Sequence, residues 1–406
     1  MKRLEVRFTR GPGDEFPVGV LAGETGRVYF EYDAGFLERG LELSPMRMPA
    51  VSGLHEHRNA NFGPLPGLFA DSLPDGWGLL LMDRHFRSSG LAIEEVSPLD
   101  RLAWLGANTM GALTYHPPAD AGGDERGAFD LGELCRAAHA VLEGESAEVL
   151  PQLLRAGGSP GGARPKVLVG VRGDDLRSGE ADLPDGWDHW MVKFPGRRDD
   201  ADAGPVEYAY SLMARAAGVE MPETRLFDDG RGGRHFGAAR FDRRGNRRFH
   251  VHTFAGLIET DFRVPACDYG DLLRAASILT RNQSEVLKAF RLMAFNVLAH
   301  NRDDHAKNFA FLLDDESGEW RLAPAYDLTL APGPGGEHTM TVAGEGRSPG
   351  PEHMRKLATV VGIKRRTADE IIGEVREAVG RWPEFAERSG VGAEATGRVA
   401  ERCGHS

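Results

Sequence analysis

A glycine-rich loop that runs directly into an apolar strand is the feature that most constrains the fold of this chain. Residues 157–166 contain four glycines and end in Lys166, and residues 167–171 have the composition of a buried strand. Backbone N–H groups of glycines can approach phosphate oxygens without a clash from Cβ atoms. No Gly-Lys-Ser or Gly-Lys-Thr follows, and a strand follows instead of a helix, which excludes Walker and Rossmann loops. We interpret the segment as a phosphate-binding loop, with an ordinary flexible hairpin as the alternative.

The elements that follow this loop have the order of a nucleotide-binding lobe. A strand at 190–194 carries Lys193 among apolar residues, and a buried ammonium needs a counter-charge such as nucleotide phosphates. A lysine that reaches solvent from a strand end is the alternative. Glu207, at the start of the next helix, is the carboxylate available to pair with Lys193. The other elements predicted in this lobe are helices at 131–142 and 208–217 and strands at 224–227 and 236–241.

The strongest pattern combines Asp303 with Asn308, five residues later, and with Asp327 after a predicted two-strand hairpin. Protein kinases use this order, in which the first Asp orients and deprotonates a hydroxyl while the Asn and the later Asp hold Mg²⁺. Oxygen ligands without cysteine suit such a hard cation. Two alternatives remain open at this point. The segment could be a polar loop that satisfies its own backbone, or Asp-Asp-His at 303–305 could belong to a metallohydrolase cluster.

A length of 406 residues predicts two or three folding units. We expect a small α/β unit at 1–115, a linker at 116–127, a lobe with the glycine-rich loop at 128–245, and a mainly helical lobe at 246–406. A core helix of the last lobe is expected to begin after Ser284 as its N-cap. The pentapeptide Leu-Pro-Asp-Gly-Trp occurs at 73–77 and 183–187 with unrelated flanks. This repetition predicts a turn that is used twice and no internal repeat.

Charge and cysteine content limit the partners and the compartment. The chain carries 49 Lys and Arg against 61 Asp and Glu, a net charge of −12, which argues against tight DNA binding by the chain alone. Its three cysteines have no spacing typical of a zinc site or a disulfide framework. The first eight residues alternate like a strand and lack the apolar stretch of a signal peptide, and no run is long enough to span a membrane. We therefore expect a cytoplasmic protein without membrane contact.

Six motifs in order resemble the HipA-type toxins, the serine/threonine-protein kinases of type II toxin–antitoxin modules. The resemblance extends over nearly the whole chain and implies an α+β, two-lobed protein-kinase-like fold with an added small N-terminal α/β subdomain. The motifs that carry it are Asp-Ser-Leu-Pro-Asp-Gly-Trp-Gly at 71–78, the loop at 158–166, Val-Lys-Phe-Pro at 192–195, Arg-Phe-Asp-Arg at 240–243, the segment at 301–308 and Ala-Tyr-Asp at 325–327.

The resemblance implies ATP- and Mg²⁺-dependent phosphorylation of protein serine or threonine, with Asp303 as the catalytic base and Asn308 and Asp327 as the metal ligands. Ser159 falls on the family's autophosphorylation position, where the added negative charge would eject the phosphate loop. His300 stands where family members usually carry glycine. The residues that the resemblance assigns to the ATP site are Gly161, Gly162, Ala163, Arg164, Pro165, Lys166, Lys193, Arg240, Phe241, His305, Lys307 and Tyr326.

The resemblance also implies partners. The family's targets are translation components, typically an aminoacyl-tRNA synthetase such as the glutamyl enzyme, whose phosphorylation halts growth. The family's antitoxin is a small helix-turn-helix protein that binds operator DNA, so an acidic toxin would reach DNA only indirectly, through the antitoxin. A small-molecule phosphotransferase of the aminoglycoside-kinase type and a catalytically inactive co-repressor are the alternatives. A full set of ATP and Mg²⁺ residues argues against the inactive co-repressor.

Overall fold

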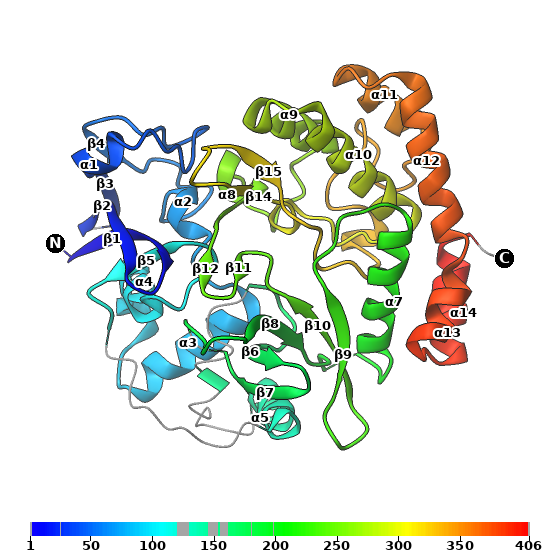
Figure 1. The fold of residues 1–406 in the computed structure, drawn as a ribbon, viewed down its shortest axis with the longest axis horizontal. Coiled ribbons are helices and arrows are strands. Elements are labelled where there is room, and N and C mark those ends of the chain that lie inside the picture. The colour runs from blue at the N-terminus through cyan, green and yellow to red at the C-terminus, as the bar shows by residue number, and fades with distance from the viewer. Residues whose placement is uncertain are drawn as a thin grey trace.

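The computed structural model describes residues 2–24, 26–119, 130–144, 153–154, 161–179, 181–197 and 199–404. Ser159 and most of the expected linker at 116–127 therefore lie outside the described residues. The fold is α+β, as expected, with separate sheets that are joined and covered by helices (Figure 1). Among the described residues, no helix has both the length and the apolar character needed to cross a lipid bilayer.

The N-terminal unit is built on a five-stranded antiparallel sheet with the order β4-β3-β2-β1-β5. Leu4, Val6 and Phe8 alternate into its core, which is why the charged residues between them do not interrupt β1. The elements of this unit are β1 (Lys2–Gly11), β2 (Asp14–Glu24), β3 (Arg27–Tyr32), α1 (Ala34–Leu37), β4 (Leu54–Glu56), α2 (Gly67–Ala70), α3 (Gly76–Ser88), η1 (Ile93–Glu95), α4 (Pro98–Leu105) and β5 (Leu113–His116).

The second sheet has the order β7-β6-β8-β10-β9 and follows the predicted sequence of strands. Apolar side chains on one face of β6 and β8, such as Val167, Val169 and Val192, pack into a core with helix α5. The expected boundary between the lobes, at 245/246, falls in the turn of the β11–β12 hairpin. The elements here are α5 (Leu131–Glu143), β6 (Lys166–Arg172), β7 (Asp175–Ser178), β8 (Asp188–Lys193), α7 (Ala203–Ala216), β9 (Thr224–Asp228), β10 (Arg234–Ala239), β11 (Arg243–Arg244) and β12 (Arg247–Arg248).

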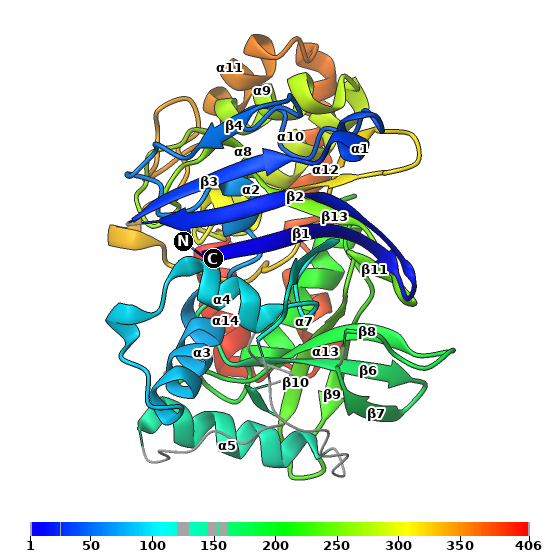
Figure 2. The same ribbon diagram turned by 90° about the vertical axis from the view of Figure 1, so that its left-hand side faces the viewer.

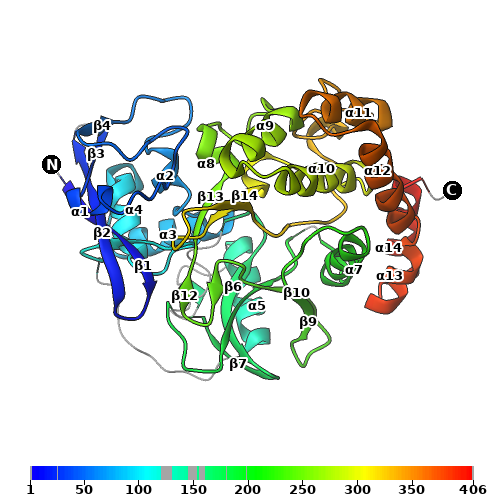
Figure 3. The ribbon, with the colours of Figure 1, turned by 45° about the horizontal axis from the view of Figure 1, so that its top comes forward.

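The rest of the chain forms a small sheet, β13-β14-β15, beside a stack of helices that ends at the C-terminus (Figures 1 and 3). The prediction that Ser284 caps the core helix is wrong, because α10 begins one residue earlier and Asn282 Oδ1 accepts the Ser284 N–H at 3.0 Å. The elements are β13 (His250–Thr253), α8 (Phe254–Ile258), α9 (Tyr269–Thr280), α10 (Gln283–Leu298), η2 (Ala306–Asn308), β14 (Ala310–Leu313), β15 (Trp320–Leu322), η3 (Pro334–Gly336), α11 (Pro351–Val360), α12 (Arg365–Val379), α13 (Trp382–Ser389) and α14 (Ala393–Arg402).

The N-terminal unit packs against both other parts. Its sheet shares one continuous core with α9, α10 and α12, whereas Trp77 and Leu81 of α3 belong to the core under the second sheet. Figure 2 shows strands β1–β3 lying across the middle of the molecule, and Figure 1 shows α3 next to β6 and β8. The N-terminal unit is thus placed to touch loops from both lobes at once.

Candidate active site

A cleft of about 560 Å³ lies where the end of the second sheet faces the loop at 301–308, which we call the catalytic loop. Its walls also include Phe262 and Arg263 on one side and the segment at 329–334 on the other. The structure brings seven residues of the predicted site together in this cleft. They are Ala163, Arg164, Lys166, Lys193, Asp303, His305 and Asp327.

Lys193 is buried between two carboxylates. Its Nζ contacts Glu207 on α7, which confirms the predicted pairing, and lies 2.5 Å from Asp327 Oδ1. Burial alone would lower the pKa of Lys193, but Asp327 and Glu207 outweigh it and raise this pKa above its ordinary value. Although burial opposes it, the charges of Lys193 and Lys166 hold the pKa of Asp327 well below its usual range. This cluster therefore stays ionised at neutral pH.

Lys166 is paired with Lys193 across strands β6 and β8, and no carboxylate of the described residues lies at hydrogen-bond distance from it. Its Nζ donates to the carbonyl of Gly161 in the glycine-rich loop. Burial and the charge of Lys193 lower the pKa of Lys166 to about 8. Gly162 has a φ of +97°, a left-handed conformation that favours glycine, and a Cβ there would meet Lys166 Nζ.

Asp303 projects into the cleft and its side chain is 61% exposed. Water reaches it, but the cleft walls still raise the pKa of Asp303, as do the carboxylates of Asp327 and Asp304, against the opposing effect of His305. Asn308 donates from Nδ2 to the Asp303 carbonyl at 2.7 Å, which fixes the shape of the loop between them. Asp303 is thus an accessible carboxylate with a proton affinity higher than that of an ordinary surface Asp.

The neighbouring Asp304 has a different role, which the sequence analysis did not find. It is fully buried and accepts hydrogen bonds from Tyr269 Oη at 2.8 Å, His338 Nδ1 at 2.7 Å and the Thr339 N–H at 2.8 Å. Asp304 therefore anchors the catalytic loop from below. Asp304 is engaged in this way, and among the described residues no group of three His, Cys, Asp or Glu side chains is placed to hold a metal ion, which argues against the metallohydrolase alternative.

Two residues at the cleft have left-handed backbone conformations. His300, at the entrance of the catalytic loop, has a φ of +52°, and Asp327 has a φ of +57°. Glycine adopts this conformation most easily, so His300 holds a backbone conformation that strains any residue other than glycine.

The remaining predicted residues lie outside the lining of the cleft. Arg240 donates to Asp242 and to the Thr109 carbonyl, away from the cleft. Phe241 stacks on Tyr326 with ring centroids 5.5 Å apart, and Tyr326 Oη donates to the Lys307 carbonyl at 2.7 Å. These two rings support the catalytic loop from behind. The assignment of an adenine-side role to 240–241 stays a prediction.

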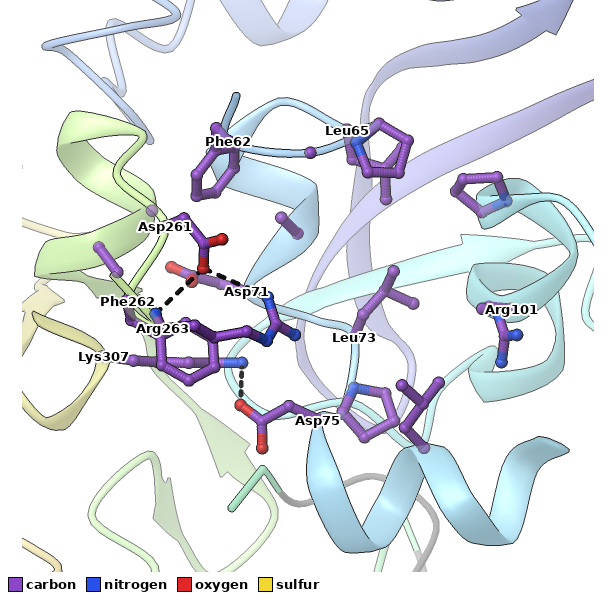
Figure 4. Close-up of a pocket in the computed structure, with 18 of the residues that line it drawn as sticks. Phe62, Leu65, Asp71, Leu73, Asp75, Arg101, Asp261, Phe262, Arg263 and Lys307 are labelled. Atoms are coloured by element: carbon purple, nitrogen blue, oxygen red, sulfur yellow. Dashed lines mark hydrogen bonds and ion pairs between the residues drawn. The ribbon is translucent and has the colours of Figure 1, made fainter. Parts of the chain in front are cut away.

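Lys307 points into a second, smaller cavity of about 310 Å³ between the N-terminal unit and the catalytic loop (Figure 4). Its Nζ lies 2.7 Å from Asp75 Oδ2 and 5.2 Å from the centre of the Phe262 ring. The cavity walls combine apolar residues such as Leu65 and Leu73 with these charged groups. Asp75 belongs to the motif at 71–78, but the sequence offered no sign that it would meet Lys307.

The donor set of the cleft fits a nucleotide with its metal ion. Arg164, Lys166 and Lys193 bring three cations to the cleft. Arg164 and Lys193 pair with carboxylates, whereas Lys166 donates to a backbone carbonyl, so its charge is available to a phosphate. Mg²⁺ is usually held by one or two carboxylates together with substrate phosphates, so Asp327 and the amide oxygen of Asn308 would suffice as protein ligands.

Comparisons with known proteins match both halves of the chain to one family. The model of the HipA-like C-terminal domain matches residues 158–382, and that of the HipA N-terminal domain matches residues 13–116. The protein named "Putative kinase Y4mE" of Sinorhizobium fredii is 36% identical over 125 residues, which span 31% of this chain and 23% of that protein. HipA of Shewanella oneidensis, solved with HipB and operator DNA, superposes with a TM-score of 0.71 at 16% identity, covering 98% of this chain and 95% of that one.

Proposed function

Because the chain belongs to the HipA family, as the matches to both of its domain models establish, we propose that it is an ATP- and Mg²⁺-dependent serine/threonine-protein kinase. The observation that carries the proposal is the convergence of Lys193, Asp327 and Asp303 on one cleft beside a glycine-rich loop. Phosphoryl transfer depends on positioning and on electrostatic stabilisation, which this set of charges can provide.

Each residue has a role in the proposed reaction. Bound Mg-ATP supplies the transferable phosphoryl group and an electrophilic phosphorus. Asp303 accepts the proton of a serine or threonine hydroxyl of the substrate protein. As the proton leaves, the hydroxyl oxygen forms a bond to the γ-phosphorus, and the bond from this phosphorus to the leaving ADP oxygen breaks. Lys193, Lys166 and Arg164 neutralise phosphate oxygens. Asn308 and Asp327 would hold the metal, Asp327 exchanging its ion pair with Lys193 for this contact.

The raised pKa of Asp303 favours this role, since a general base works best when its pKa approaches the working pH. The same feature predicts that activity rises with pH as this carboxylate loses its proton. A catalytically inactive co-repressor would have no use for an exposed carboxylate with a raised pKa, and this observation favours the kinase.

We extend the proposal to regulation and partners. Ser159 would be the site of autophosphorylation, a small helix-turn-helix antitoxin would neutralise the kinase and reach DNA for it, and the substrate would be a translation component such as an aminoacyl-tRNA synthetase. The solved relative from Shewanella oneidensis was crystallised with HipB and operator DNA, which supports the antitoxin.

The intact mass of the protein after incubation with Mg-ATP tests the proposal. We expect the addition of one phosphate that maps to Ser159 and is absent from Asp303→Asn, with a loss of rate of about 10²–10⁴-fold, the usual contribution of a general base. Mg-ATP should still raise the stability of both proteins, by about 2.7 kcal/mol at a hundredfold excess over Kd. Asp314→Asn, in the turn after β14, is the control and should keep the full rate.

Two outcomes would contradict the proposal. A protein that gains no stability from Mg-ATP would have no nucleotide site. A protein that binds Mg-ATP and phosphorylates small hydroxyl compounds, but neither itself nor a protein, would be a small-molecule phosphotransferase.

A further inference from the structure

Asp75 connects three parts of the molecule that are far apart in the sequence. It lies at the N-cap of α3 in the N-terminal unit, and its side chain is 12% exposed. Oδ1 accepts the backbone N–H of Gly162 in the glycine-rich loop, and Oδ2 pairs with Lys307 of the catalytic loop at 2.7 Å. One carboxylate from outside the two lobes thus binds the two loops that line opposite sides of the nucleotide cleft.

The backbone around Asp75 is shaped to fit the glycine-rich loop. The Trp77 N–H donates to the Gly162 carbonyl at 3.0 Å, and Trp77 Nε1 donates to the Lys166 carbonyl at 3.0 Å. Gly76 has a φ of +44°, and a Cβ there would lie 2.7 Å from the Gly162 carbonyl oxygen. The segment at 75–77 therefore contacts both the start and the end of the described part of the loop.

The charge of Asp75 is secured by its surroundings. Burial acts to raise its pKa, but Lys307, the Gly162 N–H and Lys166 outweigh burial and hold the pKa below its ordinary value. Lys307 is in turn held over the Phe262 ring and away from the lining of the cleft. A charged hydrogen bond of this kind stabilises a fixed geometry more strongly than a neutral one.

We propose that Asp75 is a positioning residue through which the N-terminal unit holds the glycine-rich loop against the catalytic loop and so sets the affinity for nucleotide. This inference rests on the proposed kinase function. It goes further by giving the N-terminal unit a part in the reaction, through a residue that touches neither the nucleotide nor the substrate hydroxyl. Displacement of this contact by any partner that moves the segment at 75–77 would loosen the loop.

Hydrogen exchange of the free protein tests the contact without any nucleotide. In Asp75→Asn, the amides at 161–168 should exchange at least about tenfold faster, since a charged hydrogen bond to a backbone N–H is typically worth that factor or more. Asp75→Glu should restore part of the protection. Asp83→Asn is the matched control, because Asp83 lies on the same helix and pairs with Arg101 at 2.5 Å without touching either loop.

Steady-state kinetics test the consequence. We expect the KM for ATP to rise about tenfold in Asp75→Asn while kcat falls less than threefold. A residue that merely stabilised the fold would leave both constants of the folded fraction unchanged. Lys307→Met removes the ion pair between Asp75 and Lys307 by changing its other partner. This variant replaces Asp75→Asn in the test if Asp75→Asn does not fold.

The outcomes separate this inference from the proposed function. If the wild-type protein binds Mg-ATP but Asp75→Asn has the same amide exchange and the same KM as the wild type, the role of Asp75 is overturned and the kinase proposal stands. Faster exchange in a protein that binds no nucleotide would support the contact and overturn the kinase.

Discussion

Two clusters of buried charge, one around Asp242 and one around Lys193, differ in whether the protein supplies all of their partners. In the first, Asp242 is fully buried and accepts hydrogen bonds from Arg240, Arg243 and the Gly111 N–H. The guanidinium groups use further N–H donors on the carbonyls of Thr109 and Gly111. This closed cluster fastens the N-terminal unit to the second sheet.

The second cluster, around Lys193, is open. Asp327 remains 31% exposed, and Lys166 beside it has a backbone carbonyl but no carboxylate as its partner. Buried charges that remain incompletely compensated are costly, and they are found where a ligand completes them. The comparison teaches that a motif of Arg and Asp can stabilise the fold as easily as it can bind a ligand. A structural cluster has partners for its charges within the protein, whereas a binding cluster leaves some charges without a counter-charge.

Asp242→Asn should have the largest effect on stability. Removal of the carboxylate leaves Arg240 and Arg243 buried without their counter-charge, which typically costs about 3–5 kcal/mol of the free energy of unfolding. Denaturant titration measures this loss. The remaining folded protein should bind Mg-ATP with unchanged affinity, and weakened binding would erase the distinction between the two clusters.

The control for that variant is Asp182→Asn. Asp182 lies 3.9 Å from the buried Arg248 but is 46% exposed, so its loss should cost at most about 1 kcal/mol.

Lys193→Met tests the open cluster. The nucleotide affinity should fall about 10–100-fold, the usual value of a charged hydrogen bond or two, as measured by calorimetry. Lys288→Met, which removes a partly exposed lysine that pairs with Glu220 and with the buried Glu285, should leave the affinity unchanged. An affinity within threefold of wild type in Lys193→Met would show that this cluster serves the fold alone.

Lys166 should give the cleft a dependence on pH. Its pKa is lowered to about 8, so its charge is present below that pH and is lost above it. We expect affinity for ATP to fall by up to about tenfold above pH 8, and Lys166→Arg, which stays charged, to remove this dependence.

The same shift has the opposite effect on the stability of the free protein. Between pH 8 and the ordinary value of 10.5 the unfolded chain binds more protons at this lysine than the folded chain does, so the contribution of Lys166 to the free energy of unfolding should rise across that interval. The wild type should therefore gain stability with pH relative to Lys166→Met. An equal dependence on pH in the two proteins would contradict the burial of this ammonium.

The smallest expected effect belongs to His300→Gly. A left-handed conformation costs a residue other than glycine about 1–2 kcal/mol, and the substitution by glycine removes this strain. Part of the gain in stability is cancelled, because glycine has greater conformational freedom in the unfolded chain. The melting temperature should therefore rise slightly, with nucleotide affinity unchanged. A lower melting temperature would mean that the imidazole makes a favourable contact that exceeds the backbone strain.

The local sequence pattern predicted the helices and strands and the order of the site residues along the chain. This was possible because β6, β8 and the catalytic loop each have a recognisable motif of consecutive residues. Lys193 among apolar residues required a counter-charge, and Glu207, at the start of the next helix, was the carboxylate predicted to pair with it. The same reasoning could not find the partner of Asp75, since Lys307 lies 232 residues away and only the tertiary fold brings them together. The assignment of Ser159 also stays a prediction.

The repeated pentapeptide shows the limit of local reasoning most clearly. At 183–187 it forms a turn before β8, as predicted. At 73–77 the expectation of a turn is wrong in its second half, because Gly76 and Trp77 are the first residues of α3. The five residues are identical, and what differs is the surroundings, where Trp77 finds the Gly162 and Lys166 carbonyls as partners.

The pairing of Lys166 with Lys193 across β6 and β8 limits where residues can be inserted or deleted during evolution. Loss of a single residue inside β8 would turn every following side chain of that strand to the other face and drive the Lys193 ammonium into the layer that Val167 and Val192 now fill. Length variation should accumulate in the turn between β6 and β7 and in the connection between β7 and β8, while β6 and β8 keep a constant number of residues.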